Sequence, residues 1–155
     1  MHSIDKKINE LGLFLPKVST PIANYLPYKI HKEILYISGQ GPIKDGKILY
    51  SGKIGKDLST EEGILASKLC CLNILSIIRD ACKGDWEKFE SILKIGGFVN
   101  CIDEFKDQPK IINGASDMLV EIFGEKGKHS RFAVGANSLP LDIAVEIEAL
   151  VVIKK

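Results

Sequence analysis

Residues 143–153, with the sequence IAVEIEALVVI, form the most regular segment of the chain and decide its fold class. Every odd position in this segment is apolar, which matches the alternation of side chains between the two faces of a β-strand. The same alternation places Glu146 and Glu148 on the opposite face, beside Leu150 and Val152. The segment therefore predicts a strand with one face buried under helices and a second, mixed face that forms an interface.

Two helices are expected to cover the apolar face. The first spans residues 59–82, where Ser59 and Glu62 form the S-x-x-E pattern of a capping box and Gly84 follows as the C-cap. The second begins at residues 107–109, because a proline is tolerated in the first turn of a helix. The apolar face of this second helix is formed by Ile111, Ala115, Met118 and Ile122.

Short segments rich in β-branched and aromatic residues predict the remaining strands. These strands are expected at residues 33–38, 47–51, 52–56, 89–101 and 131–136. Within the longest of them, Gly96 and Gly97 indicate a bulge or a close approach of neighbouring groups. Before the first strand, the N-terminal arm (residues 1–20) is expected to carry a short helix over residues 3–11 that Ser3 caps.

In chain order these elements run βββ-α-β-α-ββ after the N-terminal arm. That order predicts an α+β fold in which two helices pack on one face of a mixed β-sheet. The chain has 155 residues, and no repeat or linker divides it, so a single domain over residues 1–155 is expected.

The composition is that of a globular protein, with 45% hydrophobic and 26% charged residues. The 21 Lys and Arg residues against 20 Asp and Glu give a net charge of +1, which argues against a nucleic-acid partner because such proteins gather a basic surplus on one face. No apolar run approaches the roughly 20 residues that cross a bilayer. Since the first residues also lack the pattern of a signal peptide, we expect a cytoplasmic protein without a membrane partner.

Neither the cysteines nor the histidines are spaced as metal ligands. The cysteines form no C-x-x-C pair and two of them are adjacent, so reduced thiols that fill space are expected rather than disulfides. The histidines are scattered along the chain, and we expect neither a metal nor a cofactor. The residues concerned are Cys70, Cys71, Cys82, Cys101, His2, His31 and His129.

A few polar residues at strand ends are candidates for chemistry. Arg131 is one of only two arginines beside 19 lysines, and a guanidinium at the start of a strand can hold a carboxylate through two parallel hydrogen bonds. An ion pair with a loop acid is the alternative. Glu146 either orders a water molecule in a pocket or lies on a solvated strand face.

Two further segments before and after the first strand are weaker candidates. Ser38 and Gly39 lie where a strand meets a Gly-rich turn, and backbone amides at such a turn can receive an anion. Tyr25 precedes the strand and serves either packing or the lining of a site.

Several short motifs, in order along the chain, resemble those of the Rid family, also called YjgF-like or endoribonuclease L-PSP. The matching segments are YISGQGP at 36–42, GDW at 84–86, FVN at 98–100, HSR at 129–131, LP at 139–140 and VEIE at 145–148. The resemblance covers roughly residues 20–153, and the chain looks like a longer branch of that family.

The resemblance implies a chorismate-mutase-like fold and a homotrimer whose sheets surround a central barrel, with a cleft at each subunit interface. It implies hydrolysis of reactive 2-imino or enamine acids to 2-keto acids and ammonia, without a cofactor. By position, Arg131 matches the arginine that holds the substrate carboxylate, and Glu146 matches the glutamate near the attacking water. Ser38 and Gly39 match the turn that contacts the ligand, and Tyr25 matches a tyrosine at the mouth of the cleft.

The chain departs from the family pattern around the arginine. Ala133 stands where a cysteine is often found, and Phe132 replaces a small residue. Where the deaminases commonly place an asparagine, this chain offers Ser116 or, shifted along the helix, Asn113. A non-catalytic trimer that binds small carboxylates or has a regulatory role is therefore the alternative function, and a ribonuclease is the third.

Overall fold

The computed structural model describes residues 1–21 and 23–154. Five strands form one mixed sheet in the order β1-β2-β7-β5-β6, in which only the β5–β6 pair is parallel. The bounds of these strands are Tyr28–His31 (β1), Ile34–Gln40 (β2), Phe89–Asn100 (β5), Ser130–Ala136 (β6) and Val145–Ile153 (β7). Two short strands, β3 (Ile43–Lys44) and β4 (Lys47–Ile48), pair as a separate hairpin.

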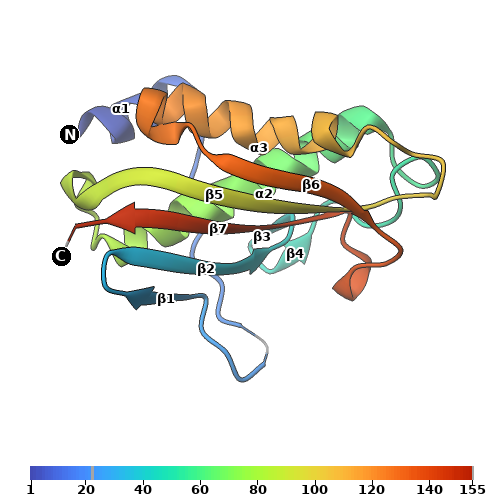
Figure 1. Ribbon diagram of the computed structural model, residues 1–155, viewed down its shortest axis with the longest axis horizontal. Helices are drawn as coiled ribbons and strands as arrows, with labels where there is room; N and C mark the ends of the chain where they lie inside the picture. Colours follow the sequence, from blue (N-terminus) through green and yellow to red (C-terminus); the bar gives the residue numbers. More distant parts are fainter. Residues whose placement is uncertain (22, 155) are drawn as a thin grey trace.

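Helices cover one face of the five-stranded sheet, as the sequence predicts. Helix α2 (Thr60–Ala81) lies behind the sheet and α3 (Gln108–Phe123) runs along its β6 edge, while the strands face the viewer (Figure 1). Helix α1 (Ser3–Glu10) and the short 3-10 segments η1 (Trp86–Lys88), η2 (Gly124–Gly127) and η3 (Pro140–Asp142) complete the fold. The α+β class and the position of both long helices are therefore confirmed.

The core lies between β7 and the two long helices. Every odd residue from Ile143 to Ile153 is buried, so the period of two in this segment is confirmed. The predicted apolar face of α3 is buried as well, with Ile111 and Ala115 almost fully enclosed. All four cysteines are free and buried, and burial raises the pKa of the Cys70 and Cys71 thiols. These are the environments expected of thiols that fill space.

Helix α2 begins and ends with local hydrogen bonds that its sequence encodes. The Glu62 N–H donates to the Ser59 hydroxyl at 3.2 Å and the Ser59 N–H donates to the Glu62 carboxylate at 2.8 Å, so the capping box is confirmed. At the other end the C-cap is Cys82 rather than Gly84. Gly84 lies two residues further, with a φ of 77°, and its N–H donates to the Arg79 carbonyl at 2.8 Å.

Three local predictions within the first 56 residues were wrong. Helix α1 is capped by His2, whose imidazole accepts the Ile4 N–H at 3.2 Å, and Ser3 is its first residue. The strand expected at residues 52–56 is reduced to bridges at Ile54, because Gly52 and Gly55 have φ values of 111° and 91°. The strand expected at residues 47–51 spans Lys47–Ile48 only.

The glycine pair in β5 makes close contacts without a bulge. Register shifts in β5 fall nearer its start, between Phe89 and Ser91 and between Ile92 and Lys94. A Cβ on Gly96 would lie 2.4 Å from the Phe132 ring, and a Cβ on Gly97 would lie 2.5 Å from Ile112 of α3. Of the two alternatives that the sequence leaves open, the structure therefore shows the close approach.

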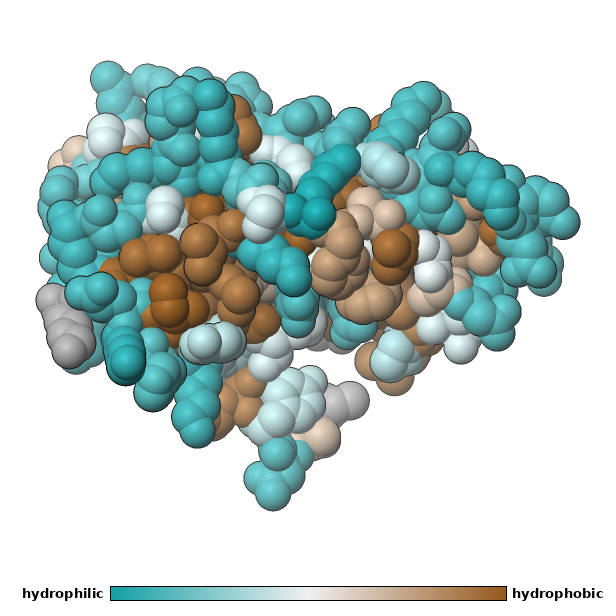
Figure 2. All heavy atoms as spheres, in the orientation of Figure 1, coloured by the Kyte–Doolittle hydropathy of each residue, from teal (hydrophilic) through white to brown (hydrophobic). Residues whose placement is uncertain are grey.

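The second face of the sheet carries no helix, and apolar side chains are exposed on it. Figure 2 shows hydrophobic surface over the strands in two areas that hydrophilic side chains separate. Tyr36 on β2 and Val134 on β6 are among the exposed apolar residues, at 46% and 42% exposure. Among residues 1–21 and 23–154, no helix is both long and apolar enough to cross a membrane.

Candidate functional site

Arg131 lies on β6 and its side chain is held against helix α3. Its Nη1 group donates to the Ser116 hydroxyl at 3.0 Å, and its Nη2 group donates to the Pro109 carbonyl at 3.3 Å. The side chain is half-buried, and no described carboxylate lies within ion-pair distance of it. The ion pair with a loop acid, which the sequence left open, is thus not found in the described part of the chain.

A histidine that sequence reasoning passed over completes this group. His129 Nε2 lies 2.9 Å from the Ser116 hydroxyl, and His129 Nδ1 lies 2.6 Å from the Gly127 carbonyl oxygen. The structure thereby joins Arg131, Ser116 and His129 in one hydrogen-bonded cluster at the β6 edge. His129 lies one residue before β6, and no pattern in the sequence points to its contact with Ser116.

Phe132, the bulky residue beside the arginine, does not crowd this cluster. Neighbours along a strand point to opposite faces, and the Phe132 ring packs over Gly96 and against Phe98, with ring centroids 5.2 Å apart. Lys94 lies over the same ring, with Nζ 5.2 Å from its centroid. The substitution therefore changes the uncovered face of the sheet rather than the surroundings of the guanidinium.

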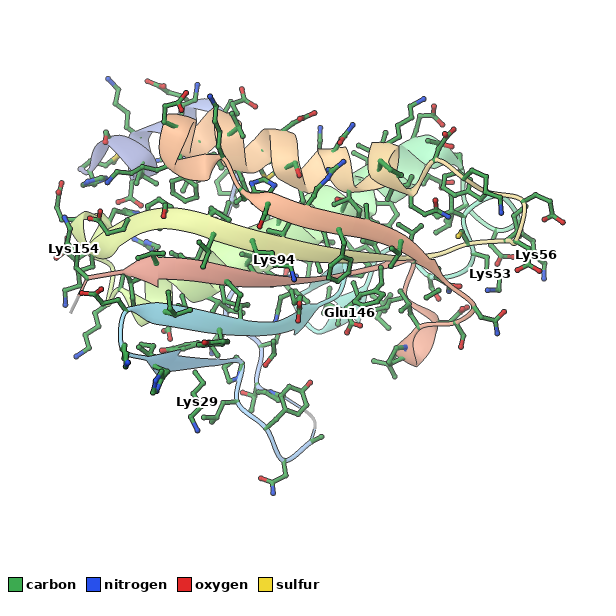
Figure 3. The ribbon with its side chains drawn as sticks, in the orientation of Figure 1. Lys29, Lys53, Lys56, Lys94, Glu146 and Lys154 are labelled. Carbon is green, nitrogen blue, oxygen red and sulfur yellow. The ribbon has the colours of Figure 1, made fainter. Side chains whose placement is uncertain are left out.

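Glu146 lies on β7 and its carboxylate packs directly over Gly39 of β2. A Cβ on Gly39 would lie 2.8 Å from Glu146 Oε1, so the absence of a side chain there makes room for the carboxylate. Burial, followed by the negative charge of Glu148, raises the pKa of the Glu146 carboxyl. Figure 3 shows Glu146 and Lys94 over the middle strands of the uncovered face.

Ser38 lies on the same uncovered face of the sheet as Glu146, and Tyr25 lies in the neighbouring loop before β1. The Ser38 hydroxyl donates to the Leu26 carbonyl at 2.7 Å, and its backbone N–H donates to Pro27, so Ser38 anchors the loop that carries Tyr25. The Ser38 amide is therefore taken up within the chain, so the predicted anion contact of this one amide is corrected. Ser38 and Gly39 lie within β2 rather than in a tight turn, and Tyr25 is 54% exposed.

A shallow hollow of about 270 Å³ lies next to these residues on the uncovered face. Its lining includes Leu26, Tyr36, Ser38 and Glu148. Among residues 1–21 and 23–154, no group of three or more His, Cys, Asp or Glu side chains is placed to hold a metal ion.

The sheet separates the two predicted catalytic residues within one chain. Arg131 pairs across the strands with Ile95, which is buried under the helices, whereas Glu146 pairs with Phe98 on the uncovered face. Directly paired residues share a face of a sheet. The fold thus brings Ser116 to Arg131 and Gly39 to Glu146, but it does not bring Arg131 and Glu146 together in one copy.

Comparison with known proteins assigns this chain to a family. A family model described as "YjgF/chorismate mutase-like, putative endoribonuclease" matches residues 5–151. Protein TCP17 from Trypanosoma cruzi is 37% identical over 145 residues, which cover 93% of this chain and 90% of that protein.

Two crystal structures are similar over nearly the whole chain. The protein Atu1372 from Agrobacterium tumefaciens, described as having unknown function, is 41% identical and has a TM-score of 0.92, with 98% of this chain and 93% of that one covered. A protein from Shewanella oneidensis, named a "putative endoribonuclease", is 34% identical and has a TM-score of 0.93, with 97% and 99% covered. The family model and these similarities show that the chain belongs to the Rid/YjgF-like family and has its chorismate mutase-like fold.

Proposed function

We propose that this protein hydrolyses 2-imino or enamine acids to 2-keto acids and ammonia, in a cleft to which two copies of the chain contribute. The observation that carries the proposal is that Arg131 keeps unused N–H donors and has no described acidic partner. A guanidinium has five N–H donors, and only two are used within the described chain, both on uncharged acceptors. Its positive charge therefore has no described counter-charge, which favours a carboxylate ligand.

The opposite placement of Arg131 and Glu146 supports a shared cleft. If both act on one substrate, Arg131 of one copy must face the uncovered sheet of another copy, where Glu146 and Ser38 lie. That sheet face exposes apolar side chains, and exposed apolar patches are typical of interfaces. Together with family membership, this supports a homotrimer as the functional assembly.

The proposed chemistry needs orientation and proton transfer. Arg131 holds the substrate carboxylate, which fixes the adjacent imine carbon in the cleft. Glu146 takes a proton from a water molecule as the water oxygen bonds to that carbon and passes the proton to the imine nitrogen. The resulting carbinolamine then releases ammonia as its C–N bond breaks and the keto group forms. A carboxyl with a raised pKa is suited to this exchange, because it accepts a proton more readily than an ordinary glutamate does and can then return it.

An amino-acid oxidase that generates imines in situ provides the test. Semicarbazide traps free imine, and an active deaminase removes the imine before it is trapped. We expect the wild-type protein to lower semicarbazone formation for at least one of several amino acids, and Glu146→Gln to abolish that effect. Semicarbazone formation that the wild-type protein leaves unchanged for every amino acid tested would contradict the proposal.

A carboxylate-binding protein without catalysis is the second candidate, because the Arg131 cluster is complete without Glu146. Isothermal titration with a 2-keto acid separates the two. Binding that is lost in Arg131→Ala, in a protein that consumes no imine, would favour the binding role.

A further inference from the structure

The cluster around Arg131 has a single direction of hydrogen bonding when its histidine is neutral. Arginine can only donate, so Ser116 Oγ accepts from Nη1. The Gly127 carbonyl can only accept, so His129 Nδ1 carries a hydrogen. A neutral imidazole then has no hydrogen on Nε2, and Nε2 must accept the Ser116 hydroxyl proton across 2.9 Å.

Protonation of His129 reverses the middle link of this chain. Both ring nitrogens of an imidazolium donate, so Nε2–H would point at Ser116 Oγ, which already accepts from Arg131. The hydroxyl proton of Ser116 must then point to a third partner. One proton on His129 therefore converts Ser116 from a donor toward the histidine into a donor toward its surroundings.

A substrate whose carboxylate is bound by Arg131 would bring its nitrogen within reach of that hydroxyl. The N–H bonds of one guanidinium nitrogen diverge, so two acceptors on Nη1 are about 5 Å apart. If Ser116 is one acceptor and the substrate carboxylate is the other, the imine nitrogen lies between them in one orientation, because it is two bonds from the carboxylate carbon. Ser116 is thus placed beside the atom that must be protonated before ammonia leaves.

We propose that Ser116 and His129 form the proton relay that protonates the departing nitrogen. This inference rests on the proposed function and adds a residue, His129, that acts through Ser116. In the step, the Ser116 hydroxyl proton passes to the amino nitrogen of the carbinolamine while the His129 Nε2 proton passes to Ser116 Oγ. The C–N bond breaks, its electron pair leaves with ammonia, and Glu146 of the other copy takes the hydroxyl proton as the keto group forms. Solvent then returns a proton to His129 and removes one from Glu146.

The charged groups on the elements around His129 are engaged with other partners or line other surfaces. On β6 the nearest is Arg131, which shares Ser116 with the histidine. From η2, Glu125 forms an ion pair with Lys128 at 2.6 Å. On α3, Asp117 and Glu121 line a different hollow, against the N-terminal arm, and Lys94 of β5 lies over the Phe132 ring on the uncovered face.

The test compares pH profiles of kcat in His129→Gln, Ser116→Ala and the double variant. In the wild type we expect kcat to fall as the pH rises, because the relay needs the proton that His129 passes to Ser116. Each single variant should lose about 100-fold in kcat and lose this pH dependence, and the double variant should lose no more than either. The affinity for a 2-keto acid should change by less than about threefold, since the remaining donors of Arg131 still bind the carboxylate.

Exposed His31 on β1 gives the matched control, and His31→Gln should keep the wild-type profile. Melting temperatures show whether the variants remain folded, and Ser116→Ala tests the relay without altering the imidazole. An active enzyme whose His129→Gln variant retains the alkaline fall in kcat, or loses keto-acid affinity in place of kcat, would overturn the relay and leave the proposed function standing. A wild-type protein that consumes no imine would overturn both.

Discussion

At the scale of single residues, Arg131 and Glu146 show how much of the candidate site can be predicted from sequence. Arg131 stands out because the chain otherwise uses lysine almost throughout, and Glu146 because it is a carboxylate on the mixed face of a strand whose odd positions are all apolar. His129 could not be found in the same way. The role proposed for it depends on a contact with Ser116 that exists only after α3 and β6 pack together. The sequence likewise could not show that the Ser38 hydroxyl donates a hydrogen bond to the Leu26 carbonyl.

Substitution of Arg131 tests whether the guanidinium binds ligand or supports the fold. Lysine keeps the charge but loses the second parallel hydrogen bond, and a charge-assisted hydrogen bond contributes roughly 1.5–3 kcal/mol. Arg131→Lys should therefore weaken 2-keto-acid binding by about 10- to 100-fold, and Arg131→Ala should weaken it further. Titration calorimetry measures both. Arg79→Lys is the control, since Arg79 forms a surface ion pair with Asp5. A lowered melting temperature with unchanged affinity would assign Arg131 to the scaffold.

The raised pKa of Glu146 predicts how stability depends on pH. The folded chain keeps the Glu146 proton at pH values where the unfolded chain has lost it, so the free energy of unfolding falls as the pH rises from the ordinary glutamate pKa through the raised one. Glutamine does not titrate, so in Glu146→Gln the free energy of unfolding no longer falls with pH for this reason. We expect the variant to melt above the wild type at pH 7 and to match it below about pH 4, where an ordinary glutamate is protonated.

Glu90 supplies a control of opposite sign. A hydrogen bond from Lys154 lowers the pKa of the Glu90 carboxyl, so its stabilisation is present at neutral pH and is lost as the pH falls through the lowered value. Glu90→Gln should therefore melt slightly below the wild type at pH 7, because exposed ion pairs contribute little. A lower melting temperature for Glu146→Gln at pH 7 would contradict the burial of its carboxylate.

At the scale of elements, strong sequence patterns predicted the helices and strands correctly, and weak patterns did not. The alternation in β7 and the capping box of α2 each encode their element locally, and both are found. Strand β1 gave no such signal, because three of its four residues are exposed and it follows a proline-rich stretch. The expected strand at 52–56 failed for a local reason, since two glycines in it adopt positive φ values.

The glycine pair of β5 predicts an order of destabilisation. A methyl group on Gly97 meets Ile112, which is fully buried between α3 and the sheet, whereas a methyl group on Gly96 meets the end of the half-buried Phe132 ring. An enclosed side chain cannot move aside, and overpacking of this kind costs typically about 1–3 kcal/mol. Urea denaturation should therefore show a larger loss for Gly97→Ala than for Gly96→Ala. The reverse order would mean that Phe132, and not Ile112, is the more rigid neighbour.

At the scale of the whole molecule, the uncovered sheet face is the feature that one chain leaves unexplained. Val134 exposes 42% of its surface on that face, and Val120 exposes 37% on the outer side of α3. If the sheet face is the interface of a trimer, Val134→Lys should give a monomer of 17.1 kDa by light scattering. Val120→Lys, the matched control, should keep the mass of the wild type. A monomeric wild-type protein, or a Val134→Lys variant of unchanged mass, would contradict the assembly.

The central claim is that one active site takes Arg131 from one copy and Glu146 from another. The most direct measurement is the imine-hydrolysis activity of Arg131→Ala and Glu146→Gln chains that are coexpressed in equal amounts. Each variant alone should be inactive. In random mixed trimers about one cleft in four receives an intact Arg131 and an intact Glu146, so the account predicts recovery of about a quarter of the wild-type activity. A mixture as inactive as its components, with hetero-oligomers shown to form, would contradict it.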